Sequence, residues 1–243
     1  MTLLNLTLPT PAENLACDEA LLDAAEAGES GEVLRFWESP EYFVVVGYAN
    51  KVATEVNVPA CEARGIPILR RCSGGGTVLQ GPGCLNYALI LRITEDGPTR
   101  SIHTANQFIM ERNRAAIASL NSQHSTLNIS VRGHTDLAIA GRKFSGNSQR
   151  RRKHHLLFHG TLLLNFDLAL VSEALPMPSL RPDYRQTRTH GDFLVGLDAP
   201  ATAIKSALSR EWGAVDAGVS FPQSRVAALV GEKYSLADWN FKF

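Results

Sequence analysis

The sequence predicts a single α+β domain, residues 1–243, built around a mixed and largely antiparallel sheet. Three observations support this fold class. Short apolar runs of strand-like character recur along the chain, several other segments show helical spacing of apolar residues, and no strong linker divides them. A chain of 243 residues is long enough for one large domain or two small ones.

The first helix has a clear start signal, after a short strand expected at residues 4–8. Thr10 is placed to cap the helix, Pro11 takes its first position, and Glu13 completes a capping box. An apolar stripe follows on one face, and we expect the helix to end near Gly28.

The next segments surround a loop rich in glycine, residues 70–77. Residues 32–37 and 42–46 are predicted to be paired strands across a four-residue turn. A short helix at residues 59–64 and a strand at 66–69 should lead into the glycine loop.

The second half begins with an apolar run and the clearest amphipathic helix, at residues 101–120. A turn around Gly141 should join two strands of a hairpin. The other predicted elements are strands at 84–91, 127–132, 136–140 and 156–165, a short helix at 167–175, and helices near 199–212 and 224–233.

The composition excludes several classes of protein. Hydrophobic residues make up 44% and charged residues 20% of the chain, as in globular proteins. The formal net charge of zero argues against a nucleic-acid binder. No apolar run approaches the roughly 18 residues that cross a bilayer, and the N-terminus does not resemble a secretory signal. Four cysteines without CxxC spacing argue against a disulfide framework or zinc site and favour a cytoplasmic location.

The glycine loop is the first candidate site. Consecutive glycines allow a ligand to approach bare backbone amides, which form an anion-binding concavity. Arg70 and Arg71 add forked donors suited to phosphate or carboxylate. The alternative is a flexible hairpin with no ligand, because Gly-Gly is also an ordinary turn signal.

Three other features suggest chemistry. Asp136 and Lys143 should face each other across the hairpin, where a carboxylate and a cation suit metal–phosphate chemistry. A solvated surface ion pair is the alternative. Asn86 and His159 lie in apolar strands, and each could instead be a structural residue satisfied by hydrogen bonds.

Two further features have open interpretations. The basic run at residues 150–155 is either a solvated face or mobile loop, or a surface that attracts polyphosphate or an acidic protein. Cys72 and Cys84 flank the glycines, so a thioester mechanism stays open, although a free cysteine is usually a small buried apolar residue.

Taken together, five motifs resemble the lipoate–protein ligase family, which belongs with biotin ligases and octanoyltransferases. In order, they are RCSGGGTV at 71–78, LN at 85–86, TDL at 135–137, GRKFSGNS at 141–148 and HGTLL at 159–163. The resemblance also includes NLACDEAL at 14–21 and extends to about Leu197.

The resemblance implies a sheet flanked by helices, with a long acyl tunnel. It also implies that lipoate or octanoate attacks ATP to form an acyl-adenylate, with Mg²⁺ as cofactor. A lysine of a lipoyl domain, on a 2-oxoacid dehydrogenase E2 protein or the glycine cleavage H protein, would then accept the acyl group. Larger ligases carry an extra C-terminal domain for which this chain has no room, so a separate accessory subunit is a candidate partner.

The same resemblance assigns roles to residues. Lys143 would be catalytic, stabilising the charge that develops in both steps, and Asp136 would hold Mg²⁺ or orient Lys143. The residues implied to bind substrate or adenylate are Arg71, Ser73, Gly74, Gly75, Gly76, Thr77, Asn86, Asp136, Ser145, Gly146, His159, Gly160 and Thr161.

Two positions depart from the family pattern: Gln80, where many ligases have histidine, and Thr135, where an asparagine is common. One competing interpretation is an octanoyl- or lipoyl-transferase that needs no ATP and uses a cysteine intermediate. No cysteine follows Cys84, which counts against it. The other is a lipoate- or adenylate-binding module without activity. A biotin ligase is disfavoured because the Gly-Arg-Gly-Arg-type loop is missing.

Overall fold

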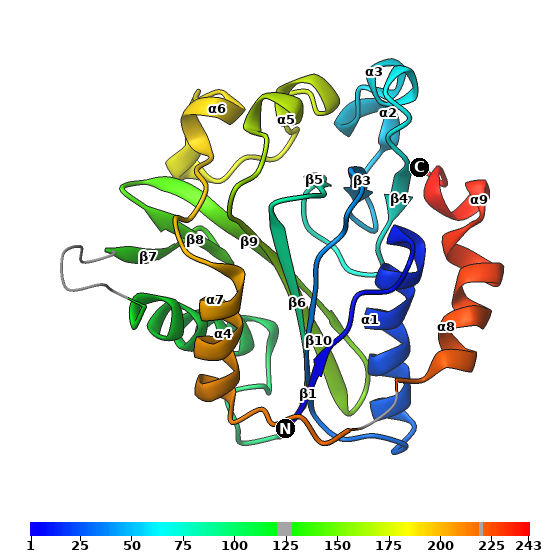
Figure 1. Ribbon diagram of the computed structural model, residues 1–243, viewed down its shortest axis with the longest axis vertical. Helices are drawn as coiled ribbons and strands as arrows, with labels where there is room; N and C mark the ends of the chain where they lie inside the picture. The colour runs from blue at the N-terminus through cyan, green and yellow to red at the C-terminus, as the bar shows by residue number, and fades with distance from the viewer. Residues whose placement is uncertain (121–127, 219–220) are drawn as a thin grey trace.

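The computed structural model describes residues 1–120, 128–218 and 221–243 and contains two sheets (Figure 1). The large sheet has seven strands in the order β1-β2-β6-β10-β9-β8-β7, and the small sheet has the order β4-β3-β5. In the large sheet only β1 and β2 are parallel, and in the small sheet only β3 and β4. The expected mixed, largely antiparallel sheet is therefore confirmed. The strands are β1 (Thr2–Asn5), β2 (Val33–Trp37), β3 (Phe43–Val46), β4 (Ile68–Arg70), β5 (Val78–Gln80), β6 (Cys84–Arg92), β7 (Ile129–Arg132), β8 (Asp136–Ile139), β9 (Arg142–Arg151) and β10 (His155–Leu163).

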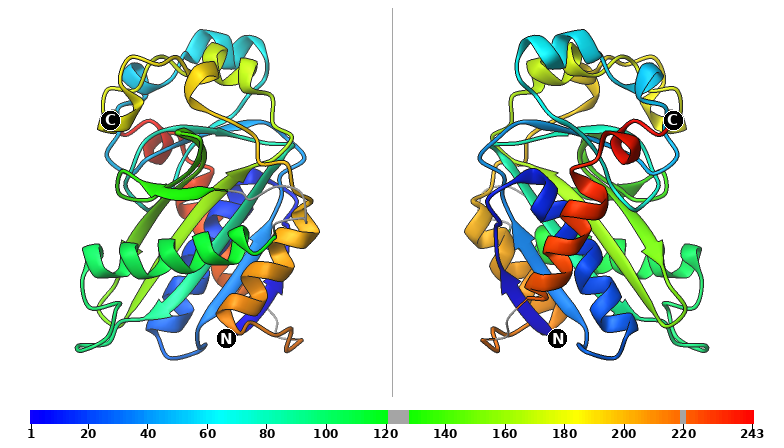
Figure 2. Two further views of the ribbon diagram at one scale, coloured as in Figure 1. Left: turned by 90° about the vertical axis from the view of Figure 1, so that its left-hand side faces the viewer. Right: turned by 90° about the vertical axis from the view of Figure 1, so that its right-hand side faces the viewer.

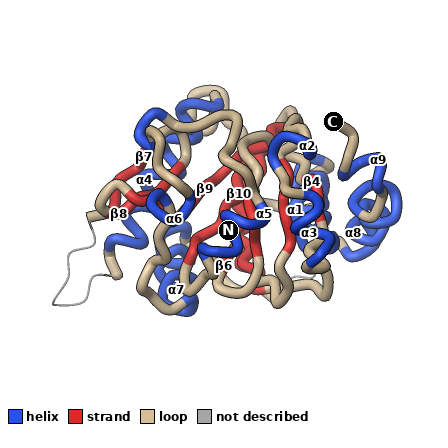
Figure 3. Tube along the Cα trace, turned by 90° about the horizontal axis from the view of Figure 1, so that it is seen from above, coloured by secondary structure: helices blue, strands red, loops and turns tan. Residues whose placement is uncertain are grey.

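Helices cover both faces of the large sheet (Figures 2 and 3). One face packs against α4 (Ile102–Ala118) and α7 (Ala201–Trp212). The other packs against α1 (Pro11–Glu26), and α8 (Gln223–Leu229) packs against α1. The shorter helices are α2 (Val52–Glu55), α3 (Val58–Ala63), α5 (Leu168–Ala174), α6 (His190–Phe193), α9 (Ala237–Asn240), the 3-10 turn Asp183–Arg185 and the π-helical turn Val230–Tyr234.

The start of α1 follows the predicted capping chemistry. Thr10 accepts a hydrogen bond from the backbone N–H of Glu13, and the Glu13 carboxylate accepts one from the backbone N–H of Thr10. Two orphan donors at the helix start are thereby satisfied. Among residues 1–120, 128–218 and 221–243, no helix combines the length and hydropathy needed for a bilayer crossing.

The predicted pairing of strands 32–37 and 42–46 is wrong. β2 lies between β1 and β6 in the large sheet, whereas β3 lies between β4 and β5 in the small one. Every residue of both strands is buried, so neither shows the alternation that would mark a shared face. The four residues read as a hairpin turn instead carry the chain from one sheet to the other.

Most other elements lie where they were expected, with shifted ends. The first strand is Thr2–Asn5 rather than residues 4–8, and the backbone N–H of Leu8 donates to the Asn14 side chain. The last predicted helix is α8 followed by the π-helical turn. The first residue of the predicted strand 127–132 lies outside the described residues, and β7 begins at Ile129.

Candidate active site

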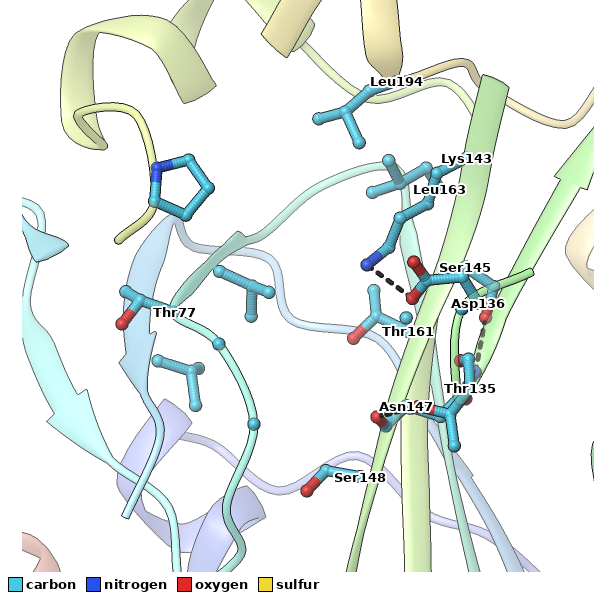
Figure 4. A pocket seen from close by; sticks show the side chains of 18 of the residues that line it. Thr77, Thr135, Asp136, Lys143, Ser145, Asn147, Ser148, Thr161, Leu163 and Leu194 are labelled. Carbon is cyan, nitrogen blue, oxygen red and sulfur yellow. Dashed lines mark hydrogen bonds and ion pairs between the residues drawn. The ribbon is translucent and has the colours of Figure 1, made fainter. Parts of the chain in front are cut away.

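A cavity of about 1120 Å³ separates the small sheet from one end of the large sheet (Figure 4). The segment from Pro176 to Leu194 forms a further wall. The predicted site residues that line the cavity are Arg71, Gly75, Gly76, Thr77, Asn86, Asp136, Lys143, Ser145, Gly146, His159, Gly160 and Thr161. Ser73 and Gly74 belong to the glycine loop but are not among the lining residues.

Part of the cavity wall is a row of directly paired residues on six neighbouring strands. The side chains of directly paired residues project from the same face of a sheet. The register therefore collects polar groups, far apart in sequence, on one surface of the cavity. From β2 to β7, the row is Trp37, Asn86, Thr161, Gly146, Asp136 and Arg132.

The ammonium group of Lys143 lies over this row. Its Nζ is 2.7 Å from Asp136 Oδ1, and a Cβ on Gly146 would come within 2.7 Å of the same nitrogen. Glycine at position 146 thus leaves room for the lysine. Figure 4 shows Lys143 and Asp136 side by side above Thr161. The pair is mostly buried in the cavity, so it is not the solvated surface pair that we considered as the alternative.

A third partner, Tyr184, was not among the predicted site residues. Its hydroxyl donates to Asp136 Oδ2 at 2.8 Å. Burial and the adjacent carboxylate raise the pKa of Tyr184, which keeps the phenol protonated as a donor. The carboxylate of Asp136 is therefore held from two sides, by Lys143 and by Tyr184, which lies 48 positions after Asp136 in the sequence.

Arg71 holds the glycine loop in shape. Its guanidinium donates to the carbonyl oxygens of Gly74 and Gly76 and to Ser73 Oγ. Gly75 adopts φ +84°, and a Cβ on Gly47 would lie 2.0 Å from the Gly75 carbonyl oxygen. Burial lowers the pKa of Arg71 to about 10, so it stays charged at neutral pH. The loop is thus an ordered wall of the cavity, not a flexible hairpin.

A buried chain of polar groups connects this loop to the large sheet. Ser73 Oγ lies 2.5 Å from His159 Nε2, and His159 Nδ1 lies 3.1 Å from Asp18 Oδ2. Asp18 also forms a 2.6 Å ion pair with Arg35, and neither side chain is more than 2% exposed. Both ring nitrogens of His159 have partners, as a structural histidine requires. Asp18 and Arg35 were not predicted as site residues, because their contact joins α1 to β2.

The two departures from the family pattern are both hydrogen-bonded here. Gln80 Nε2 donates to Thr161 Oγ1 at 2.8 Å. Thr135 Oγ1 donates to the carbonyl oxygen of Asn147, and Asn147 Nδ2 donates back to that of Thr135, each at 2.7 Å. The threonine therefore fastens the start of β8 to β9, the strand that carries Lys143.

The basic run lies at the β9–β10 hairpin, and none of its residues lines the cavity. Arg152 forms an ion pair with Asp23 at 2.8 Å, and the Glu26 carboxylate accepts hydrogen bonds from the backbone N–H groups of residues 153–155. Acidic residues of α1 thus hold this run, which argues against the interpretation as a mobile loop.

The cysteines also lie outside the cavity lining. All four are buried, and burial raises the pKa of Cys72 and of Cys84 to about 12. In the described part of the chain, no three His, Cys, Asp or Glu side chains converge where they could hold a metal ion. The role of Asp136 in holding Mg²⁺ stays a prediction.

Known proteins with similar sequences include lipoate–protein ligases and octanoyltransferases. A family model described as the lipoyl protein ligase A/B catalytic domain matches residues 10–216. Octanoyltransferase LipM of Geobacillus kaustophilus is 27% identical, over 96% of this chain and 94% of its own length. Lipoate-protein ligase A subunit 1 of Thermoplasma acidophilum is 26% identical, over 97% of this chain and 95% of its own.

Solved structures show the same fold. The bi-partite lipoate protein ligase from Thermoplasma acidophilum, studied with its E2 lipoyl domain, has a TM-score of 0.80 at 24% identity and covers 99% of this chain and 95% of that one. A lipoate-protein ligase A bound with ATP has a TM-score of 0.76 at 24% identity and covers 99% of this chain and 98% of that one.

Proposed function

The chain belongs to the family of lipoyl protein ligase A/B catalytic domains, and from this premise we propose that it is an ATP-dependent lipoate–protein ligase. The observation that carries the proposal is the Lys143 ammonium group over a polar row in a large cavity, with no cysteine among the lining residues. A cation so placed suits acyl-adenylate chemistry, whereas a thioester route needs a thiol in reach of the acyl group.

The first step would join the acid to the nucleotide. A carboxylate oxygen of lipoate or octanoate attacks the α-phosphorus of ATP, and the bond to pyrophosphate breaks. Lys143 would neutralise negative charge on the carboxylate and the α-phosphate as they approach, since a cation fixed beside the reacting groups stabilises developing charge. Where Mg²⁺ is bound, Asp136 would hold it, and the ion would neutralise phosphate charge.

The second step would transfer the acyl group. The neutral amine of an acceptor lysine attacks the acyl carbonyl, the bond to the AMP oxygen breaks, and the amine loses a proton. Lys143 would stabilise the oxyanion and the departing phosphate. We propose that the acceptor is a lipoyl domain of a 2-oxoacid dehydrogenase E2 protein or the glycine cleavage H protein. A separate accessory subunit is proposed as a partner, on the model of the bi-partite Thermoplasma ligase.

A second candidate function is octanoyl transfer without ATP. It is favoured by the similarity to octanoyltransferase LipM along nearly the whole chain. It is disfavoured by the position of the thiols, which are buried outside the cavity lining. A binding module without activity is the third, and it requires that Lys143 perform no chemistry.

The test is release of pyrophosphate by the purified protein with ATP, Mg²⁺ and lipoate or octanoate, with and without an apo lipoyl domain. We expect release, and we expect Lys143→Ala to lower its rate by about 10²- to 10³-fold, the usual cost of losing a group that stabilises charge. Lys153→Ala is the matched control, because this lysine is exposed and does not line the cavity.

Three outcomes would contradict the proposal. Acyl transfer from an acyl carrier protein without ATP would favour the octanoyltransferase. Binding of lipoate without turnover would favour the binding module. Full activity of a folded Lys143→Ala variant would remove Lys143 from the mechanism.

A further inference from the structure

Three polar side chains from three strands form a hydrogen-bonded chain along the cavity wall. Gln80 Nε2, on β5 of the small sheet, donates to Thr161 Oγ1 on β10 at 2.8 Å. Thr161 Oγ1 donates to Asn86 Oδ1 on β6 at 2.6 Å. All three line the cavity, and Gln80 and Asn86 are only 7% and 2% exposed. Thr161 and Asn86 are also direct partners in the large sheet.

The two outer side chains of this hydrogen-bonded series, Gln80 and Asn86, each have one polar atom without a partner among the described residues. Gln80 Oε1 and Asn86 Nδ2 are buried and form no hydrogen bond with any described residue. A buried donor without an acceptor is unfavourable, and native structures usually satisfy such groups with protein, water or ligand. An N–H donor at Asn86 therefore suits a ligand that carries an acceptor oxygen.

The direction of these hydrogen bonds determines which atom of the Asn86 amide remains available to a ligand. A threonine hydroxyl has a single proton. Because Gln80 already donates to Thr161 Oγ1, that proton is given to Asn86 Oδ1. The Asn86 carbonyl is then engaged, and its amide nitrogen remains available. If the residue at position 80 only accepted hydrogen bonds, the hydroxyl would turn toward it and the Asn86 amide would have to reverse.

We propose that Gln80 is a positioning residue that, through Thr161, makes Asn86 present an N–H donor to the carbonyl oxygen of the activated acyl group. The inference rests on the proposed function only in that an acyl group is transferred. An acyl-adenylate and an acyl thioester carry the same carbonyl. In this arrangement Asn86 contacts the reacting atoms, whereas Gln80 acts only through its neighbours.

The geometry of the row supports this role. Asn86 pairs with Thr161, and Thr161 pairs with Gly146, over which the Lys143 ammonium lies. Two strand spacings separate Asn86 from Gly146, a distance of about 10 Å. A carbonyl between them would be reached by the amide from one side and by the ammonium from the other. Such preorganised donors stabilise an oxyanion.

The sharpest test is Gln80→Glu, which keeps the shape of the side chain and reverses the direction of the hydrogen bonds. An ionised carboxylate cannot donate, so Thr161 would donate to it and the Asn86 carbonyl would face the acyl oxygen. At pH 8 we expect kcat to fall about 100-fold, the usual cost of one oxyanion donor, with little change in the KM for the acid. Protonation restores a donor at position 80, so the ratio of variant to wild-type kcat should rise as the pH falls.

Two further variants separate this role from a merely structural one. Gln80→Met keeps the length without any hydrogen bond, and its loss should be smaller and independent of pH. Thr161→Ser keeps the hydroxyl and should retain most of the activity. Melting temperatures of all variants would show that each is folded.

The inference is overturned if Gln80→Glu matches either the wild type or Gln80→Met at every pH. Transfer from a thioester without ATP would contradict the proposed ligase but leave the role of Gln80 open to the same measurement. A wild-type protein that transfers no acyl group from any donor would overturn both.

Discussion

At the scale of single residues, the four thiols distinguish the two acyl-transfer chemistries. Cys17, Cys61, Cys72 and Cys84 are all buried. Burial raises the pKa of Cys72 and of Cys84 to about 12, so each thiol is protonated across the whole physiological range and becomes a thiolate only near that pH. Because the thiolate is the nucleophile, neither cysteine is prepared to form a thioester.

We therefore predict that iodoacetamide at pH 8 labels none of the four cysteines in the native protein and all of them in denaturant. Mass spectrometry of intact protein would count the labels, and acyl transfer should survive the treatment. Rapid labelling of Cys72 or Cys84 with parallel loss of activity would instead support a cysteine intermediate.

The position of Asp136 and Lys143 on either side of a glycine turn predicted that they face each other across a hairpin, and the family resemblance predicted their roles. Tyr184 could not be predicted in the same way. Its contact with Asp136 depends on how the segment after α5 returns over the cavity, and no local pattern encodes that path. The same holds for Asp18, whose partners lie on β2 and β10.

At the scale of elements, the C-terminal helix α9 braces the strand that enters the glycine loop. The backbone N–H of Arg70 donates to Asn240 Oδ1 at 2.9 Å, and the buried Arg70 guanidinium donates to the carbonyl oxygens of Trp239 and Asn240. The family model ends at residue 216, so these contacts come from outside the matched region. No helix was predicted for these residues.

We predict that Asn240→Ala lowers the free energy of unfolding by about 1–3 kcal/mol, because it leaves a buried N–H without a partner. Urea denaturation would measure the change. Asp238→Ala is the matched control, since this residue lies on the same helix and is exposed. Equal stability of the two variants would show that α9 does not brace β4.

The hairpin between β8 and β9 was predictable from its turn signal. Ala140 and Gly141 both adopt positive φ, 48° and 74°, which matches the tight turn expected between β8 and β9. The pairing predicted for β2 and β3 was wrong although a turn signal was present there too. Residues 38–41 look like a turn, but two fully buried strands carry no information about which sheet each one joins.

At the scale of the whole molecule, the cavity lies between two sheets that share no strand. The large sheet contributes Lys143 and the polar row, and the small sheet contributes Gln80 and borders the glycine loop. The α+β class followed from the succession of strand-like and helical segments, and the helices that flank the sheet followed from the family resemblance, whereas the division into two sheets followed from neither. The site residues were predictable as separate motifs, but the row that brings them together can be seen only from the register of the strands.

A ligand that occupies this cavity should hold the two sheets together, so it should raise the melting temperature. A ligand at 100 times its Kd adds about 2.7 kcal/mol of stability, which for a chain of this size is a shift of about 5–10 °C. We expect lipoate with Mg²⁺-ATP to give a larger shift than the sum of the two alone, because the acyl-adenylate combines both ligands in one molecule. Differential scanning calorimetry would measure it.

The Lys143→Ala variant separates binding from chemistry in this measurement. It should keep part of each single-ligand shift but lose the excess, since the adenylate forms too slowly to accumulate. An excess that persists in this variant would mean that acid and nucleotide stabilise the protein without reacting. Additive shifts in the wild type would mean that no acyl-adenylate is held between the sheets, and the ligase proposal would then lose its thermodynamic support.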